Sequence, residues 1–331
     1  MKALVTGGGG YLGRHIVEQL LARGDEATVF ARSNYPEMEK IGAKLFRGDV
    51  QDNEAVAEAC RGMDAVFHVA ARATAWGPWQ SFYQTNVVGT ENIIDACRRH
   101  GVSKLVYTST PSVIANGKPR PGVNESHPYP DRFDNYYPQT KAMAEQLVAK
   151  ANGPALSTVS LRPRAIFGPR DTQLLAQVVA RAKAGRLIQI GEGTNKSDVT
   201  YIDDAARAHL LAADALEPGS PVAGSVYFIN QGEPVKVWSF INDLVTQLGY
   251  PPIKRRISLP VARSVAHVIQ WVYRTLRLKG EPLLVPFVVN ELALDFYADI
   301  SKARRDFGYE PQISVAEGLS RTVAYFRNNH S

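Results

Sequence analysis

The chain has 331 residues, of which 45% are hydrophobic and 21% are charged, and its formal net charge is +6. This is an ordinary globular composition, and the length suits one large domain or two unequal ones. No stretch approaches the roughly 20 apolar residues of a membrane span, and neither a signal peptide nor a nucleic-acid-binding module is visible. We therefore expect a cytoplasmic protein whose basic surface attracts an anionic cofactor or substrate. Cys60 and Cys97 fall in helix-like stretches, which indicates a reducing compartment rather than a disulfide framework.

The first thirty residues indicate a phosphate-binding turn. A short apolar strand at residues 2–5 leads into Gly7-x-x-Gly10-x-x-Gly13, and residues 11–23 then carry the apolar stripe of a helix. Glycines at these positions let the backbone turn tightly and let a pyrophosphate approach the N–H groups at the start of the helix. Because the motif lies between a strand and a helix, it predicts a dinucleotide-binding site.

The end of the second strand predicts which dinucleotide is bound. Proteins selective for NAD usually place Asp or Glu here to bind the ribose 2′-hydroxyl, whereas this sequence has Arg32. An arginine can pair with a 2′-phosphate that a carboxylate would repel. Arg32 therefore predicts NADP(H) in preference to NAD(H), with Arg14 as a weaker second candidate. Asp49 and Val50 follow a third short strand, where an adenine edge would be held.

Strands and helices continue to alternate along the middle of the chain. The segments DAVFHVAA, KLVYTST and STVSLRP are typical of buried strands, and helical patterns separate them. This order predicts a parallel, doubly wound sheet, whose ligands lie beyond the carboxyl ends of the strands. Thr108, Ser109, Thr110 and Ser112 follow one of these strands. The segment 115–136 is rich in Pro, Gly, Asn and Asp and is predicted to be a long loop.

A tyrosine and a lysine four residues apart begin the next predicted helix. The pattern occurs twice, as Tyr137-x-x-x-Lys141 and as Tyr250-x-x-x-Lys254, but two consecutive prolines prevent a helix in the second copy. Chance alone would give about half a match, so the pattern is weak without its context. In the first copy, Pro138 suits the first helical turn and good helix formers follow. A cationic lysine on the same helix face would favour the phenolate and lower the pKa of the tyrosine.

Together these segments resemble the extended short-chain dehydrogenase/reductase family over essentially the whole chain. Within it, the resemblance is strongest to the 3β-hydroxysteroid dehydrogenase branch, which includes the bacterial 2-alkyl-3-oxoalkanoate reductases of olefin biosynthesis. The matching segments are Thr6-Gly7-x-x-Gly10-x-x-Gly13, GDV at 48–50, HVAA at 68–71, Asn86, YTSTPSV at 107–113, Tyr137-x-x-x-Lys141, LRPRAIFGPRD at 161–171 and TYIDDAARAHLLAA at 200–213.

The resemblance implies a role for many of these positions. Tyr137 would exchange a proton with the oxygen of a ketone or alcohol, Lys141 would also hold the nicotinamide ribose, and Thr110 would hydrogen-bond the reacting oxygen. Ser109 and Ser112 remain alternatives to Thr110, and no metal-binding set is visible. The expected cofactor-binding residues are Gly7, Gly10, Tyr11, Leu12, Gly13, Arg32, Asp49, Val50, Ala70, Ala71, Lys141, Pro163 and Ile166.

The alternation of strands and helices loosens after residue 168. We therefore expect a Rossmann domain over residues 1–168, joined again by 200–230. A smaller, mostly helical substrate domain would comprise 169–199 and 231–331.

Segment 260–279 of the expected substrate domain is amphipathic. It is predicted to pack into the core, to roof a lipid-sized pocket, or to contact a membrane surface or a pathway enzyme. Relatives also suggest a homodimer. The apolar stripe consists of Val261, Val265, Val268, Ile269, Val272 and Leu276, and the opposite polar stripe of Arg263, His267, Gln270, Arg274 and Arg277.

The expected activity is NADP(H)-dependent interconversion of a ketone and a secondary alcohol on a hydrophobic substrate, such as a 2-alkyl-3-oxoalkanoate. A 3β-hydroxysteroid is the nearest alternative and a nucleotide-sugar epimerase a more remote one. A non-catalytic NADP(H) sensor is the alternative from a different class. Nucleotide-sugar dehydratases carry an Asp-Glu pair after the catalytic threonine, and Pro111-Ser112 stands there instead. His68 and His209 are expected to be structural.

Overall fold

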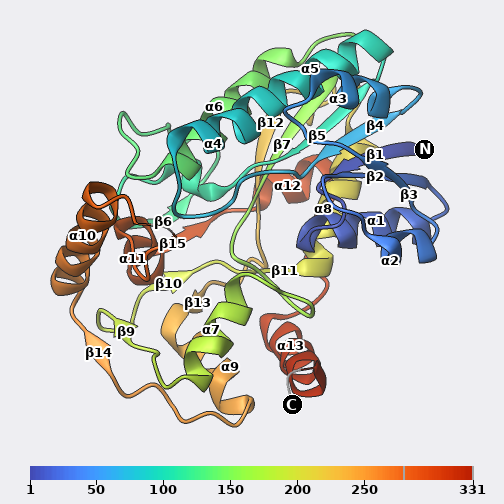
Figure 1. Ribbon diagram of the computed structural model, residues 1–331. Coiled ribbons are helices and arrows are strands. Elements are labelled where there is room, and N and C mark those ends of the chain that lie inside the picture. Colours follow the sequence, from blue (N-terminus) through green and yellow to red (C-terminus); the bar gives the residue numbers. More distant parts are fainter. Residues whose placement is uncertain (279, 330–331) are drawn as a thin grey trace.

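The computed structural model describes residues 1–278 and 280–329. The chain folds around a seven-stranded parallel sheet with the order β12-β7-β5-β4-β1-β2-β3 (Figure 1). The predicted doubly wound parallel sheet is therefore confirmed. Its strands are β1 (Lys2–Thr6), β2 (Glu26–Ala31), β3 (Lys44–Arg47), β4 (Ala65–His68), β5 (Lys104–Thr108), β7 (Ser157–Pro163) and β12 (Ser225–Ile229).

Helices cover both faces of this sheet (Figure 1). One face carries α3 (Asn53–Cys60), α5 (Gly89–His100) and α6 (Tyr136–Ala151), which contact one another in that order. The other face carries α1 (Tyr11–Ala22) and α8 (Ile202–Ala215), packed side by side. Short helices fill the connections, namely α2 (Pro36–Lys40), α4 (Trp79–Tyr83), the π-helical segment Gln84–Val88 and the 3₁₀ helix Pro111–Ile114.

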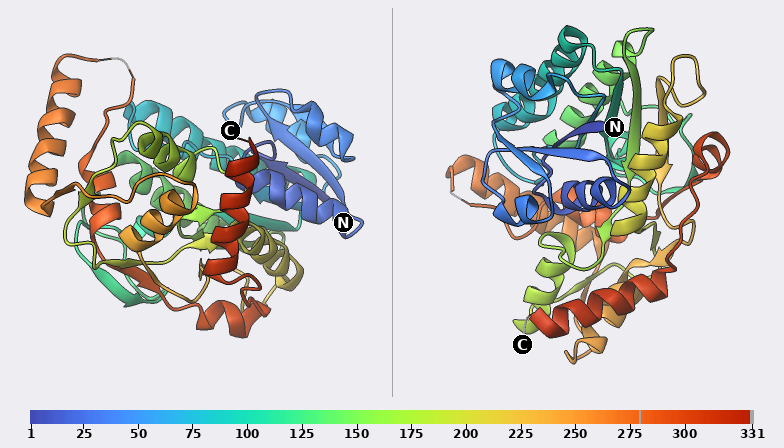
Figure 2. Two further views of the ribbon diagram at one scale, coloured as in Figure 1. Left: turned by 90° about the horizontal axis from the view of Figure 1, so that it is seen from below. Right: turned by 90° about the vertical axis from the view of Figure 1, so that its right-hand side faces the viewer.

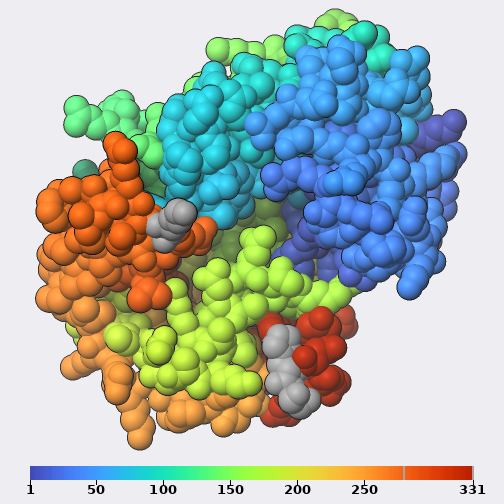
Figure 3. All heavy atoms as spheres, in the orientation of Figure 1, coloured from blue at the N-terminus to red at the C-terminus, as the bar shows by residue number. Residues whose placement is uncertain are grey.

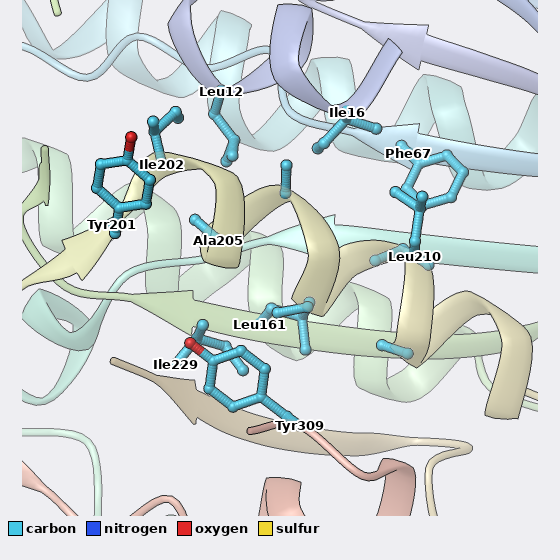
Figure 4. Close-up of a cluster of buried hydrophobic side chains, with 14 of the residues drawn as sticks. Leu12, Ile16, Phe67, Leu161, Tyr201, Ile202, Ala205, Leu210, Ile229 and Tyr309 are labelled. Carbon is cyan, nitrogen blue, oxygen red and sulfur yellow. The ribbon is translucent and has the colours of Figure 1, made fainter. Parts of the chain in front are cut away.

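The core between α1, α8 and the sheet explains why these segments are helical. Leu12 and Ile16, four residues apart on α1, lie on one face of that helix and meet Ala205 and Leu210 of α8 (Figure 4). Fully burying one Leu or Ile side chain contributes about 1.5–3 kcal/mol, so the apolar stripe fixes the direction of α1. The start of α1 is thereby held against the end of β1.

The remainder of the chain is mostly helical, as predicted, and it also contains small sheets that were not predicted (Figure 2). A four-stranded sheet has the order β13-β10-β15-β6, and two pairs, β11-β8 and β14-β9, complete the strands. The elements are β6 (Arg120–Val123), β8 (Ile166–Phe167), β9 (Gln189–Ile190), β10 (Lys196–Ser197), β11 (Thr200–Tyr201), β13 (Val235–Lys236), β14 (Arg256–Ile257), β15 (Phe296–Ala298), α7 (Leu174–Lys183), α9 (Val237–Gln247), α10 (Leu259–Thr275), α11 (Pro286–Ala293), α12 (Ser301–Phe307) and α13 (Val315–Asn329).

The prediction of an uninterrupted loop over residues 115–136 is wrong, because β6 lies within it. This strand pairs in parallel with β15, which comes far later in the chain. A strand formed through such a distant partner leaves no local alternation of apolar and polar residues to recognise.

The amphipathic helix α10 does not bury its apolar stripe, so core packing of that stripe is wrong. Its buried residues are Ala262 and Ala266, whose small side chains let the helix approach its neighbours closely. Val261, Val265, Val268 and Leu276 are exposed, as is Trp271. Figures 2 and 3 show this orange segment at an outer edge of the molecule. Lys279, the last residue of the predicted segment, lies outside the described residues.

A buried ion pair joins α6 to the sheet. The Glu145 side chain is 0% exposed and that of Arg162, in β7, is 3% exposed. Nε of Arg162 donates to Oε2 of Glu145 at 3.0 Å, and the Tyr129 hydroxyl donates to Oε1 at 2.5 Å. A terminal nitrogen of Arg162 also donates to Oε1, so two side chains together satisfy this buried carboxylate, and α6 is held in register with β7.

No helix in the part of the chain that the structure describes is long and apolar enough to cross a membrane.

Candidate active site

The candidate site lies where the carboxyl ends of the central strands meet. The sheet order reverses between β1 and β4, and ligands of doubly wound sheets bind beyond this edge. The last residues of the two strands, Thr6 and His68, lie side by side in the register, and His68 is in turn paired with Tyr107 of β5. The glycine motif, the residues after β4 and the polar residues after β5 therefore leave the sheet at one edge.

The glycine motif forms a cradle that side chains would fill. A Cβ atom on Gly7 would lie 3.0 Å from the backbone of Ala70, and one on Gly13 would collide with the carbonyl oxygen of Gly7. Gly7 also has a φ of 69°, which favours glycine. Gly10 precedes α1 and offers no side chain to cap its N–H groups. This backbone fits a pyrophosphate bound at the start of the helix.

Four other predicted cofactor contacts lie beside this cradle. Ala70 donates its N–H to Oγ1 of Thr6 at 3.1 Å, which fixes the loop after β4 against Gly7, and Ala71 follows in the same loop. The Tyr11 hydroxyl is buried without a hydrogen-bond partner among the described residues. The side chain of Leu12, in contrast, points into the core (Figure 4), so only its N–H group is placed for binding.

The side chain of Arg32 is free to bind an anion at the end of β2. It is 77% exposed, and its one ion-pair partner among the described residues is Asp49, at 4.0 Å. Arg47, which was not among the predicted residues, ends the adjacent strand and donates from Nε to the carbonyl oxygen of Arg32 at 3.0 Å. Arg47 could have been predicted from the sequence, because it is a basic residue at the end of the strand that follows Arg32. The Arg47 guanidinium therefore lies against the backbone of Arg32, so the ends of the two strands carry two basic side chains.

Asp49 and Val50 form the turn after β3. Oδ1 of Asp49 accepts the N–H of Gln51 at 3.0 Å, and the carbonyl oxygen of Val50 accepts a hydrogen bond from Asn92 at 2.9 Å. The turn is thus held rigidly beside the end of β2.

Thr110 and Tyr137 come together at the end of β5. Asn135 caps α6 by accepting the N–H of Tyr137 at 2.9 Å, which places the tyrosine in the first helical turn. The Thr110 side chain lies near enough to the Tyr137 hydroxyl to favour its ionised form, and the Phe287 ring of α11 packs against the tyrosine ring with centroids 6.5 Å apart. Of the alternatives to Thr110, Ser109 has a buried hydroxyl with no partner among the described residues. Ser112 donates its N–H to Thr110 at 3.3 Å.

Lys141 lies buried one helical turn after Tyr137. Its Nζ donates to the carbonyl oxygen of Thr108 at 2.6 Å and lies 4.1 Å from the centroid of the Tyr107 ring. Burial lowers the pKa of Lys141 to about 7, and the carboxylate of Glu145 partly opposes this fall.

The expected lowering of the Tyr137 pKa is not seen. Burial raises this pKa to about 12, the hydrogen bond with Thr110 partly opposes the rise, and Glu291 adds to it. The physical reason is that desolvation of the phenolate outweighs the stabilisation expected from Lys141, whose charge is itself disfavoured by burial. The protonated phenol therefore predominates at neutral pH, as a proton donor to a ketone requires.

A turn between β7 and β8 brings Pro163 and Ile166 to the same edge of the sheet. Ala165, between them, has a φ of 41°, an uncommon conformation for a residue with a side chain. Oγ1 of Thr200 holds this turn by accepting the N–H of Arg164 at 3.2 Å and donating to the carbonyl oxygen of Arg164 at 2.7 Å.

The two histidines are structural, as expected. His68 bonds Thr6 at 2.8 Å and Thr90 at 3.0 Å, and burial lowers its pKa to about 3. His209 bonds Thr108 at 2.9 Å and the carbonyl oxygen of Ala205 at 2.7 Å. Neither ring is therefore available for acid–base chemistry at neutral pH.

The sequence matches the family model described as "3-beta hydroxysteroid dehydrogenase/isomerase family" over residues 4–261. The chain belongs to this family. Among its relatives, a 2-alkyl-3-oxoalkanoate reductase of Stenotrophomonas maltophilia is 47% identical, over 98% of this chain and 99% of the relative. A 2-alkyl-3-oxoalkanoate reductase of Shewanella oneidensis is 42% identical, over 97% and 85%. The UDP-glucose 4-epimerase of Thermus thermophilus, solved in complex with NAD, has a TM-score of 0.73 and 27% identity, over 99% and 100%.

This 3β-hydroxysteroid dehydrogenase family member is thus an oxidoreductase that acts on a CH–OH group with a nicotinamide cofactor. The residues gathered at the end of the sheet fit that chemistry. Tyr137 is a protonated phenol at neutral pH with Thr110 beside it, while the glycine cradle fits the phosphates.

The buried position of Lys141 makes a testable contribution to stability. Its pKa is about 7 in the folded chain and would be near its ordinary value of about 10.4 in the unfolded chain. Between these values the unfolded state binds more protons, so the free energy of unfolding should rise with pH. We expect a gain of roughly 2 kcal/mol between about pH 7 and pH 9 from this group, which Lys141→Met should abolish.

Urea denaturation of both proteins across this pH range checks the expectation. Lys150, which is exposed on the same helix, provides the control variant Lys150→Met. Parallel pH dependences in the wild type and in Lys141→Met would contradict the lowered pKa.

Proposed function

We propose that this protein is an NADP(H)-dependent reductase that converts a 2-alkyl-3-oxoalkanoate to the 2-alkyl-3-hydroxyalkanoate. The observation that carries the proposal is the Thr110–Tyr137 pair, set beside a glycine cradle and the exposed Arg32, in a chain of this family. The names of the two bacterial relatives support the substrate and suggest a role in olefin biosynthesis. A 3β-hydroxysteroid remains the nearest alternative substrate, because the family model bears that name.

In this proposal each residue acts at a defined atom. The cofactor, when bound, supplies the hydride to the carbonyl carbon. Tyr137 donates its phenolic proton to the carbonyl oxygen, and Thr110 hydrogen-bonds the same oxygen and holds the phenol in position. Lys141, with Nζ 2.6 Å from the Thr108 oxygen, would bind the nicotinamide ribose and restore the proton of Tyr137.

The cofactor would lie along the edge of the sheet. Gly7, Gly10 and Gly13 would hold the pyrophosphate with the N–H groups of Tyr11 and Leu12, and Arg32 the 2′-phosphate. Asp49 and Val50 would border the adenine, and Ala70, Ala71, Pro163 and Ile166 would enclose the rest through main-chain atoms. We further propose that residues 1–168 and 200–230 form the cofactor domain and that the remaining residues form the substrate domain.

Tyr137→Phe tests the catalytic assignment. Loss of the proton donor should lower kcat for reduction of a long-chain 2-alkyl-3-oxo acid by about 100- to 10,000-fold. The affinity for NADPH, measured by fluorescence titration, should stay within about threefold, because the hydroxyl is the only group removed.

Tyr250→Phe, at the copy of the pattern outside a helix, serves as the control and should retain activity. Equal kcat values for Tyr137→Phe and the wild type would contradict the catalytic role of Tyr137 and favour a non-catalytic NADP(H) sensor. If the wild type does not reduce lipid ketones but turns over a steroid or a UDP-sugar, that compound replaces the 2-alkyl-3-oxoalkanoate as the proposed substrate.

Arg32→Ser tests the cofactor preference. Charge-assisted hydrogen bonds contribute about 1.5–3 kcal/mol each, so kcat/KM for NADPH should fall by roughly 10- to 100-fold while that for NADH changes little. The measurement compares NADPH and NADH oxidation by the wild type, Arg32→Ser and Arg47→Ser. An unchanged ratio of the two cofactors in Arg32→Ser, or a wild type that prefers NADH, would contradict the assignment.

The exposed stripe of α10 supports contact with an anionic membrane surface. Trp271 is 66% exposed, and Val268 and Leu276 are exposed beside it. No acidic residue occurs between residues 251 and 280, whereas Lys254, Arg255, Arg256, Arg274 and Arg277 are exposed around the helix. An amphipathic helix with apolar and basic faces of this kind binds the interface of anionic bilayers.

Co-sedimentation with vesicles tests this contact. We expect the wild type to bind vesicles that contain anionic lipid, and Val268→Glu/Trp271→Glu to lose about tenfold or more in affinity. Ile41→Glu, at an exposed apolar residue elsewhere, should bind normally. If the wild type binds no vesicle, the proposal is refuted. If the Glu variant has half the mass of the wild type in solution, the wild type forms a homodimer through this face instead.

A further inference from the structure

A group of buried charged side chains lies directly behind the Phe287 ring. The space is enclosed by β6 and β15 on one side and by α11 on the other, with Phe287, Asn290 and Glu291 projecting from α11. Its volume is about 20 Å³, enough for one water-sized group. Arg120 and Arg164 are the two buried cations of this pocket.

The two arginines differ in how their charge is compensated. Arg164 forms an ion pair with Glu291, bonds Ser197 at 3.2 Å and lies over the Phe296 ring. Arg120 is only 8% exposed, yet it has no ion-pair partner among the described residues.

The guanidinium of Arg120 has unused hydrogen-bonding capacity. One NH₂ group donates to the carbonyl oxygen of Lys118 at 3.0 Å. The buried Nε has no hydrogen-bond partner in the described part of the chain. Burial lowers the pKa of Arg120, the charges of Glu291 and Asp134 partly oppose this fall, and the nearby Arg164 adds to it. A buried cation with an unsatisfied N–H group is costly unless an anion compensates it.

The pocket adjoins the reacting residues. Phe287 lines it and also packs on the Tyr137 ring, so one side chain separates Arg120 from the proposed proton donor. The charge of Glu291 reaches both the pocket and the candidate site, because it raises the pKa of Arg120 and that of Tyr137. In a 3-oxo acid, a single carbon separates the carboxylate carbon from the carbonyl carbon. When the ketone oxygen of such a substrate contacts Tyr137, its carboxylate therefore lies close to the tyrosine, on the side where Phe287 separates it from the buried arginines.

We propose that Arg120 binds the carboxylate of the 3-oxo acid substrate and so selects acids over esters and neutral ketones. This inference rests on the proposed function. Phe287 turns aside to enlarge the pocket, and the carboxylate accepts hydrogen bonds from Nε and a terminal nitrogen of Arg120. Arg164 retains Glu291 as its own counter-ion. Arginine binds planar carboxylates through two parallel N–H groups, and the pocket leaves one of these groups unused in the ligand-free chain.

The experiment compares a 2-alkyl-3-hydroxy acid with its methyl ester, both oxidised with NADP⁺, since these alcohols are chemically stable. We expect the wild type to favour the acid. Arg120→Met should lower kcat/KM for the acid by about 10- to 100-fold, because one or two charge-assisted hydrogen bonds are lost. The kcat/KM for the ester should fall by less than about threefold. Arg120→Lys should retain part of the preference. Lys150→Met, which removes an exposed cation outside the pocket, should leave the ratio unchanged.

Stability separates a binding role from a structural one. Because Arg120 is unpaired without ligand, its replacement by Met should leave the Tm of the ligand-free protein unchanged or raise it. If Arg120→Met markedly lowers the Tm and lowers kcat/KM equally for the acid and the ester, the inference is overturned and Arg120 has a structural role. Unchanged acid turnover in Arg120→Met also overturns it. A wild type that oxidises neither compound overturns the proposed function and this inference with it, whereas equal use of both compounds overturns only the inference.

Discussion

The buried ion pair between Glu145 and Arg162 is the constraint on which the candidate site depends. It joins α6 to β7, and both elements contribute to the site. Tyr137 and Lys141 lie two turns and one turn before Glu145 on the same helix, and β7 ends at Pro163. Removing one member of such a buried pair typically costs about 3–5 kcal/mol, because the other charge is left uncompensated. The same carboxylate also raises the pKa of Lys141, so the pair fixes the helix and adjusts the charge of a site residue.

The second sheet supports the site from the other side. Phe296 in β15 pairs with Arg120 in β6 and with Ser197 in β10, and its ring lies under the guanidinium of Arg164. One residue thus connects the three strands that surround the buried arginines. The helix above them, α11, reaches Tyr137 through Phe287. The buried arginines and Tyr137 are therefore held by elements that are distant in the sequence but contact one another.

The parts of the structure that could be predicted are those with local causes. The cofactor cradle follows from glycine spacing between a strand and a helix, and the start of α6 follows from Asn135, Pro138 and the helix formers after them. β6 could not be predicted, because its partner β15 comes far later in the chain. The raised pKa of Tyr137 depends on burial, and the exposure of the α10 stripe depends on packing through two alanines. Neither property is present in a short window of sequence.

The exposure of α10 also gives the protein an intrinsic optical probe. Of the four tryptophans, Trp238 is buried, Trp76 and Trp79 are partly covered, and Trp271 is exposed. Water around an indole ring shifts its emission to longer wavelength, and removal of that water reverses the shift. A blue shift of the red-most component of the emission therefore reports that this helix has become covered. The same spectrum can be followed during turnover, without labels and without altering a residue.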